Sequence, residues 1–407
     1  MSTKQHIGDQ VSRSARRATA QRAACLLAVC AQLVAAAALA GPNEQAKRIF
    51  DRIAGVPPSA SDLATMAADI QGGNAMAAAQ VALGAPQFYN TVLKNWAMPW
   101  TNRDQTEFAP LNDYVATVIG MVRDDYPFNQ ALSDDILYTS NASGLPAPSP
   151  ANNDHYTQAE AQGVDLKATL VKTTQSSVYG IPAAATAGLM TTRASASSFF
   201  INGTNRAMFR FTLMAHLCND MEQVQDTSRP PDRIRQDVSR SPGGDSRIFL
   251  NSCIGCHSGM DPMAQAFAYY NFVGTVVGDG TNTGALQYTQ GQVQAKYHIN
   301  SFNFPYGFIT PDDSWTNRWR QGPNMVLGWD STLPGSGNGA KSLGQELAAS
   351  DAFAACQVKK VFQVVCYRAP TTAADLTQVA TMKGDFKTGG YKLKQMFAEA
   401  AVYCMGQ

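Results

Sequence analysis

Five consecutive residues combine two thiols with an imidazole: Cys253, Ile254, Gly255, Cys256 and His257. On a helix, residues three and four apart share one face, so both thiols and the imidazole can act on one ligand. The C-x-x-C-H pattern is typical of covalent c-type haem attachment. The thiols would bond to two vinyl groups along one edge of the haem, and the imidazole would become an axial ligand of the iron. The sequence therefore predicts one covalent haem c held by Cys253, Cys256 and His257.

Two other uses of this cysteine pair remain as alternatives. A redox-active disulfide is typical of a thioredoxin-like βαβ pattern, which the sequence does not show. A structural zinc site needs a second pair of ligands, and the sequence contains no second C-x-x-C and no H-x₃-H. Both alternatives are therefore disfavoured against haem.

A haem that carries electrons needs a second axial ligand, commonly methionine or histidine. Met325 is the preferred candidate, because it lies in a predicted loop well downstream of His257 and could reach the other haem face. His298 and an open coordination position are the main alternatives. Further candidates are Met382, Met396 and His216. For each methionine, plain core packing is the competing interpretation.

Arginine side chains are candidates to pair with the haem propionates, because a guanidinium binds a carboxylate with two parallel hydrogen bonds. Arg206 and Arg247 are selected for this role, with Arg193 and Arg210 as further candidates. The competing interpretation is an exposed helix charge. Asp261 and Pro262 are predicted to end the haem helix, because proline lacks a backbone donor and aspartate can cap the next segment.

The N-terminus has the pattern of an export signal. Five basic residues precede an apolar run from Ala23 to Ala40, which ends in the small-x-small pattern Ala38-Leu39-Ala40. We expect cleavage after Ala40; a retained membrane anchor is the alternative. Removal of residues 1–40 leaves 27 basic and 30 acidic residues, a net charge of −3. Such a charge gives no general attraction for nucleic acid, and no later apolar run is long enough to span a bilayer. The protein is therefore expected in the periplasm or outside the cell.

Four cysteines remain beside the haem pair in the predicted mature chain: Cys218, Cys356, Cys366 and Cys404. An even number suits disulfides in an oxidising compartment, and four cysteines allow three pairings. If residues 351–367 form one straight helix, Cys356 and Cys366 lie about 15 Å apart along its axis, beyond disulfide reach. A partner such as Cys404 for one of them is then favoured, and buried free thiols are the alternative.

The fold class is predicted to be mainly α, with helical bundle units, a cytochrome c-like haem segment and an irregular, aromatic-rich loop or short β insertion. A strong helical stretch is expected from Arg206 to Val224, and another helix is expected to begin near Asp245 and to run into the cysteine pair. After the signal at 1–40 we divide the chain into an N-terminal helical domain, a linker with the haem-attachment domain, an irregular insertion and a C-terminal helical domain. These segments cover residues 41–150, 151–272, 273–340 and 341–407.

Several stretches resemble a family of bacterial planctomycete-type cytochrome c-like domains of unknown function. Cys253 to His257 followed by Met260-Asp261-Pro262-Met263 is similar to the family's CxxCHxxMDPLG. Further similar stretches are Asp125 to Thr139, Ala187 to Arg206, Leu217-Cys218, Ser342 to Arg368 and Gly389 to Leu393. Residues 273–317 depart from the family by being longer and more aromatic. The resemblance implies a haem-binding, mostly helical periplasmic protein and supplies no settled reaction.

Three hypotheses for the function remain open. The first is electron transfer to and from a redox partner protein by a haem with two protein ligands. The second is a haem enzyme, peroxidase-like or oxygen-using, with an open iron site, for which His298 or Arg320 could act on the distal side. The third is a module that binds a partner or polymer, with haem as a structural or redox element. Electron transfer is favoured, although a single-haem carrier does not need this many residues.

Overall fold

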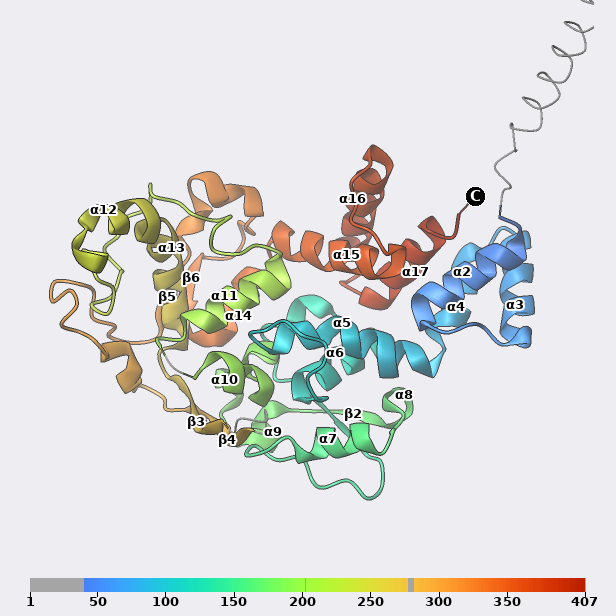
Figure 1. The fold of residues 1–407 in the computed structure, drawn as a ribbon, viewed down its shortest axis with the longest axis horizontal. Coiled ribbons are helices and arrows are strands. Elements are labelled where there is room, and N and C mark those ends of the chain that lie inside the picture. The colour runs from blue at the N-terminus through green and yellow to red at the C-terminus, as the bar shows by residue number, and fades with distance from the viewer. Residues whose placement is uncertain (1–39, 202, 277–281, 407) are drawn as a thin grey trace, which may run out of the picture.

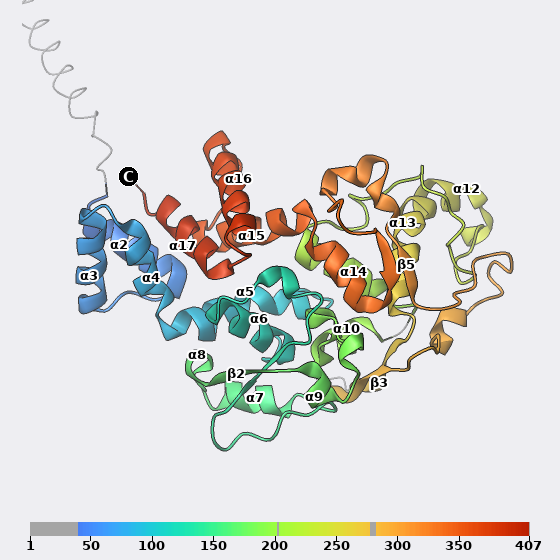
Figure 2. The same ribbon diagram turned by 180° about the vertical axis from the view of Figure 1, so that it is seen from behind.

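The computed structural model describes residues 40–201, 203–276 and 282–406 (Figures 1 and 2). The predicted export signal lies outside the described residues, apart from Ala40. The described chain is mainly helical, which confirms the predicted fold class, and it contains three separate two-stranded antiparallel sheets. None of its helices has the length and apolar character needed to cross a bilayer.

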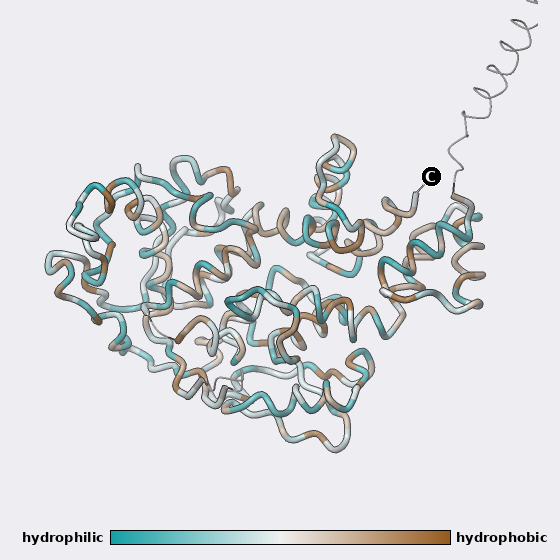
Figure 3. Tube along the Cα trace, in the orientation of Figure 1, coloured by the Kyte–Doolittle hydropathy of each residue, from teal (hydrophilic) through white to brown (hydrophobic). Residues whose placement is uncertain are grey.

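Three helices begin the described chain: α2 (Pro42–Ala54), α3 (Ala60–Gln71) and α4 (Ala75–Leu83). Helix α2 is amphipathic, with Ile49, Phe50 and Ile53 buried, and its tube alternates between hydrophilic and hydrophobic colours (Figure 3). Ser59 caps α3 by accepting a hydrogen bond from the backbone N–H of Asp62. These helices form one end of the long axis of the molecule (Figures 1 and 2).

A buried helix, α6 (Asp113–Arg123), runs through the middle of the molecule, and every residue from Asp113 to Val122 is buried. The elements before it are the π-helix η1 (Phe88–Leu93), α5 (Lys94–Ala97) and the 3-10 helix η2 (Met98–Thr101). The elements after it are η3 (Phe128–Gln130), β1 (Leu137–Ser140), α7 (Asp154–Ala161), α8 (Leu166–Thr169), β2 (Leu170–Thr173), α9 (Gln175–Tyr179), η4 (Ala183–Ala185), η5 (Gly188–Thr191) and α10 (Arg193–Phe199). Strands β1 and β2 pair antiparallel.

The helix predicted from Arg206 to Val224 is shorter than expected. It consists of α11 (Arg206–Thr212) and the π-helix η6 (Leu213–Leu217), and it ends at Cys218, whose φ of 55° is left-handed. Cys218 is tied by a disulfide to Cys356. This tertiary link holds the chain where local helical propensity alone would let the helix continue.

The helix that carries the cysteine pair runs as predicted from near Asp245. It comprises α12 (Ser246–Ile248), the π-helix η8 (Phe249–Cys253) and α13 (Ile254–Ala264), after the short η7 (Pro242–Gly244) and before η9 (Gln265–Phe267). The prediction that Asp261 and Pro262 end this helix is wrong, because Pro262 lies inside α13. Burial of Met260, Met263 and Ala264 in the main core offsets the backbone hydrogen bond that proline cannot make.

The segment expected to be irregular does contain a hairpin, formed by β3 (Tyr270–Val276) and β4 (Asn282–Tyr288). A second antiparallel pair joins β5 (Ser314–Thr316) to β6 (Ser336–Asn338). The remaining elements are the 3-10 helices η10 (Ala295–His298), η11 (Arg318–Arg320) and η12 (Pro323–Leu327).

Four helices end the chain: α14 (Gly339–Ala348), α15 (Asp351–Cys366), α16 (Ala373–Thr388) and α17 (Leu393–Tyr403). Helix α17 packs against α2 and α4, and α15 also contacts α2. One cluster of buried apolar residues extends from Ala46 to Cys404. The helices from the two ends of the sequence thus share one core, and the division into sequence domains stays a prediction.

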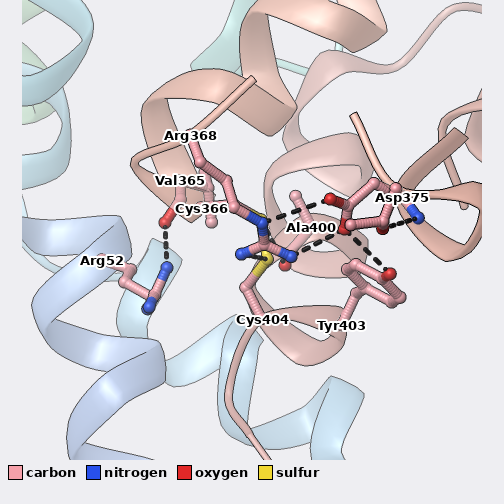
Figure 4. Close-up of a disulfide and its surroundings, with 9 residues drawn as sticks. Arg52, Val365, Cys366, Arg368, Asp375, Ala400, Tyr403 and Cys404 are labelled. Carbon is pink, nitrogen blue, oxygen red and sulfur yellow. Dashed lines mark hydrogen bonds and ion pairs between the residues drawn. A yellow bond between two sulfur atoms is a disulfide. The ribbon is translucent and has the colours of Figure 1, made fainter. Parts of the chain in front are cut away.

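The four remaining cysteines form two disulfides, Cys218–Cys356 and Cys366–Cys404. Cys356 and Cys366 lie on one helix and do not pair, and Cys404 is the partner of Cys366, so the preferred arrangement is confirmed. Near the second disulfide, Arg368 pairs with Asp375 and also donates to the Sγ atom of Cys404 (Figure 4). Arg52 of α2 donates to the carbonyl oxygen of Val365, which ties α2 to this corner (Figure 4).

Candidate haem-attachment site

The motif residues share one face of a helix near the end of the molecule opposite to α2, α3 and α4 (Figures 1 and 2). At about 100° per residue, Cys253, Cys256, His257 and Met260 fall within an arc of about 100°. Cys253, Cys256 and His257 are partly exposed, and the His257 side chain is 20% exposed. Within the described chain, Cys253 and Cys256 are the two cysteines without a disulfide partner. Their sulfur atoms therefore stay available for thioether bonds.

The opposite face of α13 is closed by close packing at two glycines. A Cβ on Gly255 would meet Gln225, Thr227 and the backbone of Asp226, and a Cβ on Gly259 would overlap the indole of Trp319. The backbone N–H of Asp226 also donates to the carbonyl oxygen of Gly255 at 2.9 Å. The helix is thereby fixed from behind, and its motif face is turned away from this packing.

The imidazole of His257 is held by a carboxylate one helical turn further on. Its Nδ1 atom lies 3.1 Å from Oδ2 of Asp261, a residue whose side chain is fully buried. Because an ionised carboxylate can only accept hydrogen bonds, Nδ1 is the donor and carries the proton. In the neutral form of the ring the other nitrogen, Nε2, is then the unprotonated one and can bind a metal. Metal-bound histidines are typically held in this way by a carboxylate or carbonyl on the second nitrogen.

Two arginines and a second carboxylate surround Asp261. Arg206 donates to Asp261 through Nε at 2.7 Å and Nη2 at 2.9 Å, and to Asp237 through Nη1 at 2.7 Å and Nη2 at 3.0 Å. Buried Arg235 lies 3.9 Å from Asp261 and stands over the ring of Tyr297. Burial alone would raise the pKa of Asp261, but Arg206, His257 and Arg235 together hold it well below its ordinary value. Asp261 is therefore a carboxylate.

An open pocket of about 490 Å³ lies beside the motif face, and this volume is within the usual range for ligand sites. Its lining includes Met260, Arg206 and Met221, and the Sγ atom of Cys256 contacts the carbonyl oxygen of Met221 at 3.5 Å. Arg210 also lines the pocket and pairs with Asp220. Arg206 and Arg210 thus line this pocket, and pairing of Arg206 with a haem propionate stays a prediction.

The environment of Cys256 is that of an ordinary thiol rather than of a redox-active one. Burial raises the pKa of Cys256, and the nearby acidic groups Asp220 and Glu222 raise it further. The reactive thiol of a redox-active C-x-x-C pair commonly lies at a free helix N-terminus, which lowers its pKa. Here η8 continues directly into α13, so the pair lies inside a continuous helix. The redox-disulfide alternative is therefore disfavoured.

Neither Arg247 nor Met325 lines the pocket beside the motif face. Arg247 is 80% exposed and pairs with Asp245 on its own short helix. Met325 is 60% exposed in η12, where the neighbouring Asn324 donates to the carbonyl oxygen of Val224. Residues 225–227 pack on Gly255, about 160° around the helix from His257. Met325 as an iron ligand and Arg247 as a propionate partner stay predictions that this arrangement does not favour.

The other ligand candidates lie in different surroundings. His298 is exposed, directly after Tyr297, whose hydroxyl donates to the carbonyl oxygen of Ala264 at the end of α13. Met382 and Met396 are fully buried in α16 and α17. His216 is buried with Nε2 at 2.7 Å from the hydroxyl of Tyr114, and burial lowers its pKa. Arg193 is also buried and donates to the carbonyl oxygen of Gly284.

The hydrogen bond between His257 and Asp261 was not predicted, although the sequence contains a signal for it. His257 and Asp261 are four residues apart, the spacing that places two side chains on neighbouring positions of a helix. Assigning Asp261 to a helix cap concealed this relation. In the described part of the chain, no group of three or more histidine, cysteine or acidic residues is arranged to hold a metal ion. A haem iron needs only one or two protein ligands.

Comparison of the chain with protein-family models, with curated proteins and with solved structures found no match. The function is therefore inferred from the residues of the site.

Proposed function

We propose that this chain is an exported c-type cytochrome-like protein that carries one haem, bound through Cys253 and Cys256, with His257 as an axial ligand. Its role is to pass electrons to and from a redox partner protein. The similarity to planctomycete-type cytochrome c-like domains is part of this proposal. A haem c, when bound, supplies a one-electron iron couple.

The observation that carries the proposal is the state of the five motif residues. Both thiols are unpaired and partly exposed on one helix face, while the other four cysteines of the described chain are paired. The imidazole on the same face has Nδ1 engaged by Asp261, which leaves Nε2 for iron. This combination is what covalent attachment with axial ligation requires of the protein.

The proposed location outside the cytoplasm is supported by the two disulfides, because such bonds form and persist in oxidising compartments. They link distant parts of the chain, Cys218 to Cys356 and Cys366 to Cys404. The N-terminal pattern ending at Ala40 supports the same location.

The test is to produce the full chain in a bacterium with the cytochrome c maturation machinery and to purify it from the periplasm. We expect a pyridine haemochrome spectrum of the c type and a mass increase of one haem per chain. In the variant Cys253→Ser/Cys256→Ser both signals should disappear. A colourless wild-type protein, or one whose cysteines 253 and 256 are oxidised to each other, would overturn the proposal.

A haem enzyme with an open iron position is the second candidate, because Met325 does not line the pocket of about 490 Å³ beside the motif face. Carbon monoxide separates the two candidates. A carrier with two strong protein ligands should not bind it after reduction, whereas an open site should bind it at once.

A further inference from the structure

We propose that Asp261 is a positioning residue for the axial imidazole. By its hydrogen bond it fixes His257 in the form with Nδ1 protonated and Nε2 free, and by its charge it favours the oxidised state of the haem. This inference rests on the haem attachment proposed above and goes beyond it, because it assigns the residue that sets the redox behaviour of the site.

The geometry holds the carboxylate of Asp261 in one place beside the imidazole of His257. Oδ2 of Asp261 is shared between His257 Nδ1 at 3.1 Å and Arg206 Nη2 at 2.9 Å, and Oδ1 accepts from Arg206 Nε at 2.7 Å. The Asp261 side chain has no solvent exposure. A carboxylate held by a two-point contact in a buried place cannot rotate away, so the imidazole ring that it holds has one orientation.

The surrounding charges keep the carboxylate in place without removing its effect on the imidazole. Arg206 is itself shared with Asp237, and Arg235 remains at 3.9 Å from Asp261. The four charged groups, two arginines and two aspartates, therefore sum to zero. Of the two aspartates, only Asp261 is hydrogen-bonded to the imidazole. Through this bond it alone can raise the electron density on Nε2, the nitrogen that would bind the iron.

The consequence for the haem follows from electrostatics. A carboxylate that accepts a hydrogen bond from Nδ1–H makes Nε2 a stronger electron donor. A stronger donor stabilises the iron state with the higher positive charge, so the oxidised form is favoured. Removing the charge of Asp261 should shift the couple towards the reduced form, and so should the uncompensated positive charge that then remains on the arginines.

The experiment compares two single substitutions in the haem-bearing full chain. Asp261→Asn removes the charge but keeps a hydrogen-bond acceptor of the same shape. Asp237→Asn removes an equal negative charge beside the same arginine, Arg206, and leaves the hydrogen bond of His257 unchanged. We expect Asp261→Asn to raise the ratio of reduced to oxidised protein at a fixed ambient potential by about tenfold, or about 59 mV for one electron. Asp237→Asn should change this ratio less than about threefold, since its effect is only through space.

Equal shifts for the two variants would show that only the net charge of the cluster matters, and no shift for either would show that Asp261 does not act on the haem. Either result would overturn the proposal. A purely structural role for Asp261 would lower haem yield or stability without moving the potential of the protein that does fold.

A second measurement covers the case in which Asp261→Asn does not fold, and it does not depend on haem. Nitrogen NMR of the periplasmic Cys253→Ser/Cys256→Ser protein, labelled at histidine, reports which ring nitrogen of His257 carries the proton. We expect it on Nδ1, whereas free neutral imidazole side chains favour Nε2. A proton on Nε2 would overturn the positioning role. Failure of the haemochrome test, with the proton on Nδ1, would overturn haem binding but not the imidazole–carboxylate pair.

Discussion

Gly259 of α13 lies directly against the indole ring of Trp319, and a side chain of any size at position 259 would overlap that ring. Trp319 is completely buried and contacts Phe209. The indole therefore cannot move aside without disturbing the core behind the motif helix. We expect Gly259→Ala to lower the free energy of unfolding by about 1–3 kcal/mol, the usual cost of overpacking, and to reduce haem yield. Urea denaturation followed by tryptophan fluorescence measures the change.

The matched control is Gly384→Ala on helix α16. A Cβ at Gly384 meets nothing within 4 Å, and its φ is not in the left-handed region. Alanine should leave stability unchanged or increase it by up to about 1 kcal/mol, because glycine inside a helix is unfavourable. If both variants lose the same stability, the packing of Gly259 on Trp319 is not the cause.

The two disulfides should contribute unequally to stability, because the chain lengths between their cysteines differ. The pair Cys366–Cys404 has a sequence separation of 38, and Cys218–Cys356 one of 138. The loop-entropy relation gives about 4 kcal/mol for the shorter loop and about 5 kcal/mol for the longer one. Replacing both cysteines of a pair by serine should therefore cost most at 218 and 356. Thermal denaturation of the two double variants measures this order, and peptide mapping of the unreduced protein checks the pairing itself.

Lys360 should make stability depend on pH in the alkaline range. Its ammonium group donates to the carbonyl oxygen of Ala215 and lies 4.1 Å from the ring centre of Trp100. Burial lowers the pKa of Lys360 from 10.5 to about 7. Between these two values the unfolded chain binds more protons than the folded one, so stability rises with pH across this window. The penalty for burying the charge is fully present below about pH 7.

The variant Lys360→Met isolates this effect from the other titrating groups. At neutral and lower pH it should be more stable than the wild type, and the difference should shrink as the pH approaches 10.5. The pKa shift sets an upper limit of about 5 kcal/mol on the difference in unfolding free energy between the two proteins. The partial solvent access of Lys360 reduces this difference. Chemical denaturation of both proteins across the pH range measures the difference. A constant difference would mean that Lys360 titrates normally in the folded protein.

Met325→Ala tests the predicted second iron ligand. Because Met325 is mostly exposed and does not line the pocket beside the motif face, we expect the absorption spectrum of the variant and its response to carbon monoxide to equal those of the wild type. The solvent exposure of Met325 gives no reason for a loss of stability either. A variant that gains carbon monoxide binding on reduction would instead identify Met325 as the ligand.

The elements that depend on local sequence could be predicted. The mainly helical fold and the helix leading into the cysteine pair both follow from the periodicity of residues close in the chain. The exclusion of a Cys356–Cys366 bond followed from helix geometry alone. The pairing of Cys366 with Cys404 agreed with that reasoning. The distance between Cys356 and Cys366 along one helix was enough to direct each of them to a partner elsewhere.

The elements that depend on contacts distant in sequence could not be predicted. Pro262 continues a helix because its neighbours are buried by other segments, and the helix of Arg206 stops at Cys218 where a distant disulfide holds the chain. The same holds for the site. Asp261 pairs with Arg206 and Arg235, and Arg206 also pairs with Asp237. These residues come from other parts of the chain, and no local pattern brings them together.

The packing of α17 on α2 and α4 places the last described helix against the first described ones. Helices α2 and α4 are synthesised early, and the part of their apolar surface that contacts α17 stays uncovered until Leu393 to Tyr403 have been made. Assembly of this part of the protein is therefore delayed until residues 393–403 have been synthesised. A chain without α17 would expose the apolar surface of α2 and α4 and would be prone to aggregate rather than to form a smaller stable protein.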